Sequence, residues 1–245
     1  MAKSARSGGS VRPKAAAKPS ILPTALDTAD LFGSKKLAAR DRAILATIST
    51  RLRVRAGTTI FERGDPATAI YSIASGAVCS FRPLTRETRR VMAFLFADDI
   101  FGLARAGRYV NTVRALTPLT VLRIPAEALK PMLLRNPELQ LHFLCKVTQA
   151  LRESQRHAIL IGSEDPAARV SRFLTMMEQA QPQPDPDVVH LPMTRRDIGD
   201  YLNLPPAGVG GALAELAKRG AVLLDNPHRI RVLDRRQLAT SADEA

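Results

Sequence analysis

The residues that could do chemistry in this chain are cations and one hydroxyl near its C-terminal end. Thr194, Arg195 and Arg196 are consecutive, and Lys218 and Arg229 follow. Guanidinium, ammonium and hydroxyl groups are donors that bind phosphate oxygens in nucleic acids. Such groups are candidates for phosphate binding, and their types imply no covalent step.

The sequence contains no motif that indicates catalysis. The run 208–211 reads GVGG, which is not G-x-G-x-x-G and does not follow a strand-like run, so we do not interpret it as a nucleotide loop. Cys79 and Cys145 are the only two cysteines, and they lack the C-x-x-C spacing of a metal site. We also find no nucleophile–base motif. We expect a protein that is not an enzyme, with no catalytic residue, no metal and no cofactor.

The chain is strongly basic, with a net charge of +13 and a pI near 10.6. This charge favours a polyanionic partner, most simply nucleic acid. The arginines are spread along the chain, for example at Arg51, Arg53, Arg55 and Arg89, so a generally basic protein is the alternative. No stretch is apolar enough to cross a membrane, and no apolar segment follows the basic N-terminus as in a secretory signal. We expect a cytoplasmic protein with no membrane partner.

Two helices and a hairpin are predicted to position the phosphate-binding residues. Thr194 is a typical N-cap, and apolar residues recur at helical spacing behind it. Pro206 suits the first turn of a second helix, which Gly220 ends. The runs AVLL (221–224) and RIRVL (229–233) flank a turn and form a wing. The spacing fits a winged helix-turn-helix, although an αα-hairpin within a core fits it equally well.

A sequence resemblance favours the first interpretation. The run MTRRDIGDYLNL (193–204) resembles the first helix and turn of the Crp/Fnr transcription regulators, most closely the FixK-type branch. The run AKRGAV (217–222) resembles the end of that family's recognition helix. The resemblance implies DNA-binding positions at Thr194, Arg195, Arg196, Pro206, Ala207, Gly210, Gly211, Lys218, Arg229 and Arg231. It also makes RNA polymerase a candidate partner.

The start of the recognition helix departs from the family pattern. Where the family has E-T-V-S-R, this chain has Ala207-Gly208-Val209-Gly210-Gly211. The family's Glu, Ser and Arg, which read base edges or hold phosphate, fall on Ala207, Gly210 and Gly211. Alanine and glycine offer no side-chain hydrogen bond, so we expect the usual direct readout to be lost. The glycines should also weaken the helix by up to ~1 kcal/mol each.

A β-rich region precedes these helices. Strand-like runs are expected at 58–61, 70–73, 77–81, 90–96 and 121–124, with a helical pattern before them at 29–48. Short strands with regular turns indicate a β-barrel or jelly roll. The runs AGTTIFERGDPATAIYSIASGAV (56–78) and FADDIFGL (96–103) resemble the cyclic-nucleotide-binding β-roll of the same family.

The ligand segment of that roll is altered. Cyclic-nucleotide-binding members have a Glu and an Arg-Ser pair after the turn, and neither follows Gly102 here. The remaining candidates for a ligand pocket are Gly102, Arg105, Arg108, Asn111 and Thr112, although loop arginines are usually solvated. Some members hold an iron–sulfur cluster through N-terminal cysteines, but this chain has no cysteine before Cys79. Haem ligation by His142 or His157 is a weaker alternative.

One long helix is predicted from Asn136 to Ile161. Its apolar residues recur in alternating three- and four-residue steps, which is typical of a coiled-coil seam. The expected dimer interface is Leu144, Val147, Leu151, Ser154, Ala158 and Ile161. A helix packed within its own monomer is the alternative.

Together these features predict an α+β chain with a β-roll, a long dimerisation helix and a C-terminal winged helix-turn-helix. The expected boundaries are a disordered basic tail at 1–25, a β-roll sensor domain at 26–125, a dimerisation helix region at 126–162, a DNA-binding domain at 163–236 and a tail at 237–245. The leading hypothesis is a homodimeric DNA-binding regulator without cyclic nucleotide or iron–sulfur cluster. One alternative is a family member that has lost sequence-specific reading and acts by heterodimerisation or as a ligand or partner sensor. A weaker one is non-specific, architectural DNA binding.

Overall fold

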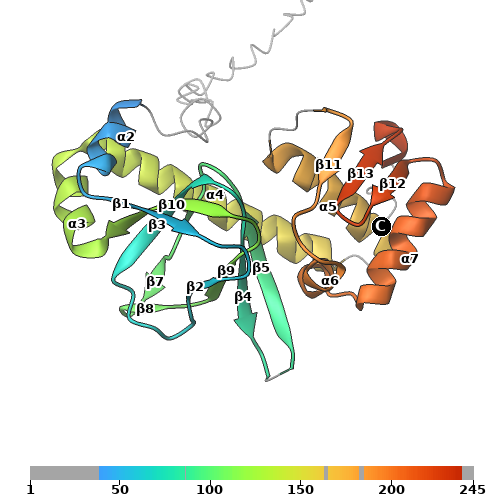
Figure 1. Cartoon of the computed structure of the whole chain (residues 1–245), viewed down its shortest axis with the longest axis horizontal. Helices are drawn as coiled ribbons and strands as arrows, with labels where there is room; N and C mark the ends of the chain where they lie inside the picture. The colour runs from blue at the N-terminus through green and yellow to red at the C-terminus, as the bar shows by residue number, and fades with distance from the viewer. Residues whose placement is uncertain (1–38, 86, 163–164, 182–184, 239–245) are drawn as a thin grey trace, which may run out of the picture. The chain divides into compact units, whose positions relative to one another are not determined.

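The computed structural model describes residues 39–85, 87–162, 165–181 and 185–238 (Figure 1). The tail expected at 1–25, the early part of the helical pattern at 29–48 and the last residues of the C-terminal tail lie outside the described residues. The segment 35–245 forms one compact unit. Only α2, Ala39–Ala46, is described from the expected first helix.

The N-terminal region is an antiparallel β-roll. Its strands are β1 (Thr50–Val54), β2 (Thr59–Phe61), β3 (Ala69–Ser75), β4 (Val78–Pro83), β5 (Arg89–Leu95), β6 (Ile100–Phe101), β7 (Ala104–Arg105), β8 (Arg108–Tyr109), β9 (Thr112–Ala115) and β10 (Leu119–Pro125). They form two four-stranded sheets, ordered β1-β10-β3-β6 and β2-β9-β4-β5, and a β7–β8 hairpin. This arrangement confirms the predicted β-roll.

Strand β1 was not among the expected strands, although its pattern has the period of a half-buried strand. Arg51 and Arg53 are exposed and alternate with the half-buried Leu52 and Val54. Alternation of this kind places charge on one face and apolar side chains on the other. Arginines on such an edge strand also discourage pairing with another sheet.

Two helices follow the roll and meet at a proline. Helix α3 spans Ala126–Arg135, and α4 spans Pro137–Gly162. Asn136 adopts a non-helical backbone, as expected for the residue before a proline. Leu139 of α4 is fully buried against the roll with Phe143 beside it, whereas the predicted seam residues Leu144, Val147 and Leu151 are exposed. Helix α4 therefore packs on the roll with one stripe and leaves another open.

The C-terminal region is a winged helix-turn-helix, as predicted. Its elements are α5 (Pro166–Ala180), β11 (Val188–His190), α6 (Arg195–Leu202), α7 (Pro206–Lys218), β12 (Val222–Asn226) and β13 (Arg229–Val232). The sheet is ordered β11-β13-β12, so β11 adds a strand that the sequence pattern did not reveal. Asp165 caps α5 by accepting hydrogen bonds from the backbone N–H groups of Ala167 and Ala168.

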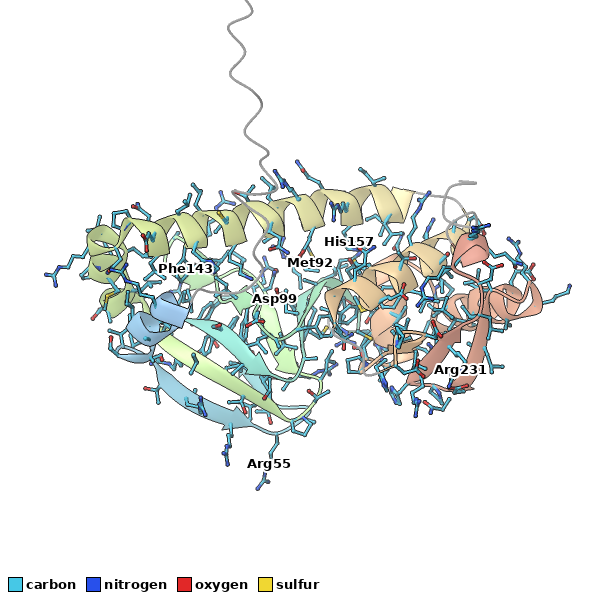
Figure 2. The ribbon with its side chains drawn as sticks, turned by 90° about the horizontal axis from the view of Figure 1, so that it is seen from above. Arg55, Met92, Asp99, Phe143, His157 and Arg231 are labelled. Carbon is cyan, nitrogen blue, oxygen red and sulfur yellow. The ribbon has the colours of Figure 1, made fainter. Side chains whose placement is uncertain are left out.

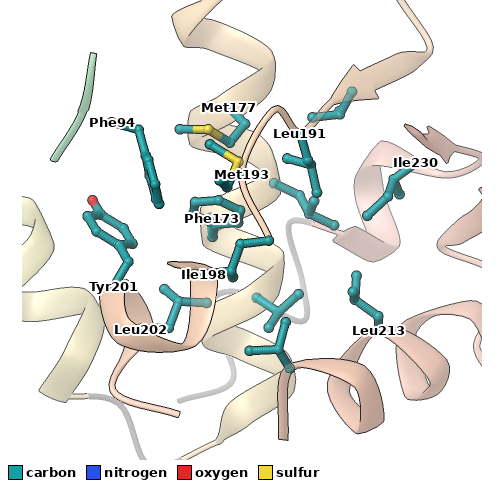
Figure 3. Close-up of a cluster of buried hydrophobic side chains, with 14 of the residues drawn as sticks. Phe94, Phe173, Met177, Leu191, Met193, Ile198, Tyr201, Leu202, Leu213 and Ile230 are labelled. Atoms are coloured by element: carbon teal, nitrogen blue, oxygen red, sulfur yellow. The ribbon is translucent and has the colours of Figure 1, made fainter. Parts of the chain in front are cut away.

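One hydrophobic cluster joins this region to the roll. Phe94 of β5 packs with Phe173 of α5 and Tyr201 of α6, with ring centroids 5.3–6.0 Å apart (Figure 3). Phe173 is fully buried. Val91 and Cys79, from β5 and β4, belong to the same cluster. The sheet that carries β4 and β5 therefore supplies part of the core under α6.

Two glycines allow the backbone geometry to be tested. Gly76, between β3 and β4, has a φ of 95°, and a Cβ there would lie 2.5 Å from the carbonyl oxygen of Pro118. A Cβ on Gly210 of α7 would meet nothing within 4 Å beyond its own helix backbone. We expect Gly76→Ala to lower the free energy of unfolding by about 1–3 kcal/mol through backbone strain. Gly210→Ala should raise it by up to ~1 kcal/mol through helix propensity.

Urea unfolding of wild type and both variants measures these differences. A Gly76→Ala variant as stable as wild type would contradict the turn geometry.

Candidate nucleic-acid interface

Helix α6 begins with a complete capping box. Thr194 accepts a hydrogen bond from the Asp197 backbone N–H at 3.1 Å, and the Asp197 carboxylate accepts one from the Thr194 backbone N–H at 2.9 Å. This reciprocal pairing satisfies backbone donors that the first helical turn leaves without partners. It fixes the backbone that carries Arg195 and Arg196.

The Asp197 carboxylate is also held by the roll. Arg89 of β5 donates from Nη2 to Oδ1, and Arg114 of β9 donates from Nη2 to the same oxygen at 3.2 Å. Arg89 also donates from Nε to Asp200 at 2.8 Å. Burial alone would raise the pKa of Asp197, but hydrogen bonds from Thr194 and the nearby Arg89 outweigh it and hold that pKa below its ordinary value.

The two arginines at the start of α6 differ in exposure. Arg196 is exposed and donates from Nη2 to the carbonyl oxygen of Glu87 at 3.1 Å. Arg195 is half-buried, and its Nη1 is buried with no hydrogen-bond partner in the described part of the chain. Burial lowers the pKa of the Arg195 guanidinium. Because this nitrogen is buried, a phosphate oxygen can accept from it only after the Arg195 side chain turns outward.

The exposed face of α7 carries almost no side-chain chemistry. Pro206, Ala207, Gly210 and Gly211 are all exposed, while Val209 is buried in the core. A Cβ at Gly210 or Gly211 would meet no neighbouring atom within 4 Å outside the helix backbone. Internal packing therefore does not require glycine at these positions, and the face presents mainly backbone and methyl groups to a partner.

The remaining predicted phosphate contacts lie at the end of α7 and in the wing. Lys218 is exposed in the last turn of α7, and Arg229 is exposed on β13. Arg231, the other predicted contact of the wing, pairs its guanidinium with Asp185 at 3.3 Å and with Asp225 at 3.6 Å. Both partners are negatively charged, so Arg231 offers less net charge to DNA than Arg229 does.

Sequence reasoning missed the contacts that hold α6 on the roll. Asp197 lies three residues after the N-cap Thr194, a capping-box spacing that the sequence already contains. Its partner Arg89 lies 108 residues away along the chain. Nothing in the local pattern around Arg89 distinguishes it from the many solvated arginines.

Of the five ligand-pocket candidates of the roll, Arg108, Asn111 and Thr112 make hydrogen bonds within the fold. Arg108 donates to the Gly64 carbonyl oxygen at 2.7 Å, and Arg105 is exposed on the β7–β8 hairpin. Asn111 accepts from Arg82 and donates to Ser80, and Thr112 accepts from the Arg63 backbone N–H. Gly102 is buried, with a φ of 92°.

Aromatic side chains fill the interior of the roll. Tyr109, from the β7–β8 hairpin, stacks on Phe61 with centroids 3.7 Å apart, and Tyr71 stacks on Phe101 at 5.0 Å. The Tyr109 hydroxyl donates to the Ala69 carbonyl oxygen, and burial raises its pKa to about 12. A cyclic nucleotide needs an arginine for its phosphate, and this apolar stack does not fit that requirement.

Two further groups that could react are occupied by packing. Burial raises the pKa of Cys79 to about 12, so its thiol is a poor nucleophile. His157 of α4 (Figure 2) stacks on Tyr201 of α6 at 3.9 Å, and its Nε2 lies 2.7 Å from the Tyr201 carbonyl oxygen. Burial lowers the pKa of His157, which keeps the ring neutral at pH 7.

Among the described residues, no three or more His, Cys, Asp or Glu side chains form a cluster that could hold a metal ion. Among the same residues no helix combines the length and apolarity that a membrane span needs.

Comparison with known proteins gives a domain match in each half of the chain. Residues 51–136 match the model of a cyclic nucleotide-binding domain, and residues 168–241 match that of a Crp-like helix-turn-helix domain. The nitrogen fixation regulation protein FixK of Azorhizobium caulinodans is 26% identical over 205 residues, which cover 82% of each chain. The fumarate and nitrate reduction regulatory protein of Escherichia coli K12 is 25% identical over 177 residues, 71% of each chain.

Solved structures agree with this match. The structure of FixK2 from Bradyrhizobium japonicum superposes with a TM-score of 0.75 at 26% identity, covering 81% of this chain and 99% of that one. A CRP-family transcriptional regulator from Thermus thermophilus shares the fold, with a TM-score of 0.68 at 21% identity over 79% of this chain and 97% of that one.

The filled roll generates a prediction about ligands. We expect neither cyclic AMP nor cyclic GMP to bind, because Tyr109 and Phe61 occupy the interior and no Arg-Ser pair follows Gly102. Isothermal titration calorimetry with each nucleotide measures this directly. Binding of either one at micromolar concentration would contradict the prediction.

Proposed function

Because the chain belongs to the Crp/Fnr family of transcription regulators, we propose that it acts as a homodimer that binds DNA strongly through phosphates and only weakly by sequence. We propose further that it works in the cytoplasm without cyclic nucleotide or iron–sulfur cluster. The single observation that carries this proposal is the face of α7, where Ala207, Gly210 and Gly211 replace the base-reading side chains.

Phosphate binding is supported by the groups around the start of α6. Arg196 is exposed, and Arg195 has a buried nitrogen without an acceptor in the described part of the chain. Lys218 and Arg229 are exposed as well. Contacts to phosphates fix the register and orientation of a protein on a duplex but carry no sequence information directly. The intact capping box favours a working DNA scaffold over a family member that has abandoned DNA.

Weak base reading follows from the same helix. Contacts that distinguish bases in the major groove are hydrogen bonds and methyl contacts. Ala207 can offer a methyl group, and the two glycines can offer neither contact through a side chain. Specificity would then depend on the deformability of the duplex and on the wing.

Two observations support the absence of an iron–sulfur cluster. The sequence contains two cysteines, whereas such clusters are usually held by four cysteine thiolates. One of them, Cys79, is fully buried within the core. The thiol of Cys145 alone cannot complete a ligand set.

Homodimer formation is supported by the open stripe of α4. Leu144, Val147 and Leu151 are 57%, 45% and 59% exposed, and Ile159 is 73% exposed. Ser154 and Ala158 are exposed on the same side of the helix, and Ile161 is half-buried. A second copy of α4 packed on this stripe would remove these side chains from water, a stabilising change of about 25 cal/mol per Å² of apolar area.

The seam yields a prediction about assembly. We expect Val147→Glu and Leu151→Glu each to convert the dimer to monomer, because each would bury an unpaired carboxylate at the interface. In the monomer both positions are exposed, so the variants should still fold. Sedimentation velocity at micromolar concentration measures the mass. Arg152→Glu, a charge change at an exposed position of α4 outside the seam, is the control and should remain dimeric.

A monomeric wild type, or dimeric Glu variants, would contradict this assignment of the seam.

The reading helix yields a second prediction. We expect the triple change Ala207→Glu, Gly210→Ser and Gly211→Arg to create a preference for a palindrome of the type that Crp/Fnr regulators bind. Each good bidentate contact discriminates by roughly 1–3 kcal/mol, and a dimer makes it twice. The open space around both glycines should admit the new side chains. Competition binding of palindromic against scrambled duplex, at one salt concentration, measures the preference.

A matched control separates base reading from helix stability. The double change Gly210→Ala and Gly211→Ala should strengthen the helix, because alanine has the higher helix propensity. It adds no hydrogen-bonding group, so it should leave the sequence preference at the wild-type value. If wild type already prefers the palindrome by about a thousandfold, in the range of specific DNA-binding proteins, other residues read the bases and this account of α7 is wrong.

A further inference from the structure

The roll holds both ends of α6. At the start of the helix, Arg89 and Arg114 donate to Asp197, and Arg89 also donates to Asp200. At its end, Arg90 donates from Nη2 to the side-chain oxygen of Asn203 at 3.1 Å. Asn203 is the C-cap of α6 and has a left-handed backbone. Two consecutive residues of β5 therefore contact opposite ends of the first helix of the helix-turn-helix.

Burial makes the Asp197 contacts difficult to replace. The Asp197 side chain is 2% exposed and that of Arg89 is 16% exposed. A buried carboxylate that loses its cationic partner keeps the cost of desolvation without compensation. Asp197 therefore has a strong preference for the position in which Arg89 and Arg114 reach it. Because Asp197 is also the capping-box residue, this preference extends to the backbone of Thr194, Arg195 and Arg196.

Arg196 contacts the roll through one of its donors and still offers the others to a partner. Its Nη2 holds the carbonyl oxygen of Glu87, at the turn between β4 and β5. A guanidinium has five N–H donors, so a single carbonyl acceptor leaves others for a phosphate. The turn therefore orients the Arg196 side chain while leaving it exposed.

We propose that Arg89 and Arg114 are positioning residues for DNA binding: they fix α6, through Asp197, in the orientation that presents Arg195 and Arg196 to phosphate. Neither arginine touches DNA in this account. The inference rests on the proposed function, because it assumes that the start of α6 meets the phosphate backbone. It adds that residues of the roll set DNA affinity from a distance.

The test compares two arginine variants with the same change in net charge. Arg89→Met removes the donors to Asp197 and Asp200, whereas Arg53→Met removes an exposed arginine of β1 that has no ion pair in the described part of the chain. Each binds a duplex that wild type has selected from a random-sequence pool, and fluorescence anisotropy measures affinity at several salt concentrations. We expect Arg89→Met to weaken binding on the order of tenfold or more, because breaking a buried charge pair removes the preference of α6 for its binding orientation. Arg53→Met should stay within about twofold of wild type, because salt screens distant charges.

The salt dependence distinguishes positioning from direct contact. The slope of the logarithm of the binding constant against the logarithm of the salt concentration counts the phosphates that the protein neutralises, at about 0.9 per phosphate. Arg89→Met should keep the wild-type slope while its affinity falls, because the bound complex keeps the same phosphate contacts and only the fraction of free protein with α6 in the binding orientation decreases. Arg89→Lys retains a charge that can pair with one carboxylate and should bind with intermediate affinity. Circular dichroism confirms that each variant is folded.

Two milder variants cover the case in which Arg89→Met does not fold. Asp200→Asn leaves all donors of Asp197 in place and removes only the negative charge that pairs with Arg89 Nε, so it should weaken binding less. Arg114→Met leaves Arg89 in place and should also give an intermediate loss at unchanged slope.

Several results would overturn the inference alone. These are equal affinity of Arg89→Met and Arg53→Met, tighter binding by Arg89→Met, or a fall of its slope by about one phosphate. If wild type binds no duplex at any salt concentration, the proposed function fails and this inference fails with it.

Discussion

A single buried carboxylate determines how the winged helix-turn-helix is held. The side chain of Asp197 is 2% exposed and accepts hydrogen bonds from the Thr194 backbone and hydroxyl, Arg89 and Arg114. Its donors come from three segments of the chain: the N-cap of its own helix, β5 and β9. A carboxylate with these partners is stable when buried, and with fewer it is costly. The geometry at the start of α6 therefore depends on the roll as much as on the helix itself.

This dependence joins the roll to the winged helix-turn-helix. The aromatic cluster of Phe94, Phe173 and Tyr201 contributes apolar burial beside the ionic contacts. Apolar packing is largely non-directional, whereas charged hydrogen bonds require specific angles. The cluster therefore contributes attraction between the sheet and α6 without fixing an angle, and the contacts of the carboxylate fix the orientation.

Much of the fold followed from local patterns. Thr194 as N-cap, the proline break before α7 and the long helix α4 were predicted because each depends on residues close in sequence. The two-residue strands β6, β7 and β8 were not predicted, because runs of this length carry no periodicity. The ion pairs of Arg89 and Arg231 could not be predicted from the sequence either. A charged side chain has the same local pattern whether it is solvated or meets a distant partner.

The ligand region of the roll was also predicted only in part. The missing Arg-Ser pair was visible in the sequence after Gly102. The sequence did not show that Tyr109 would turn inward and stack on Phe61. A tyrosine among loop residues has no pattern that separates an inward from an outward side chain, and only the closure of the β7–β8 hairpin decides it.

The space around Gly210 and Gly211 allows side chains to be added on the exposed face of α7. Because neither position contacts the rest of the fold, a new side chain there alters neither the core nor the capping box. Mutations at these codons are free of the stability cost that most core changes carry. The helix is therefore open to evolutionary retargeting, and a library randomised at Ala207, Gly210 and Gly211 would sample DNA specificities on a constant scaffold.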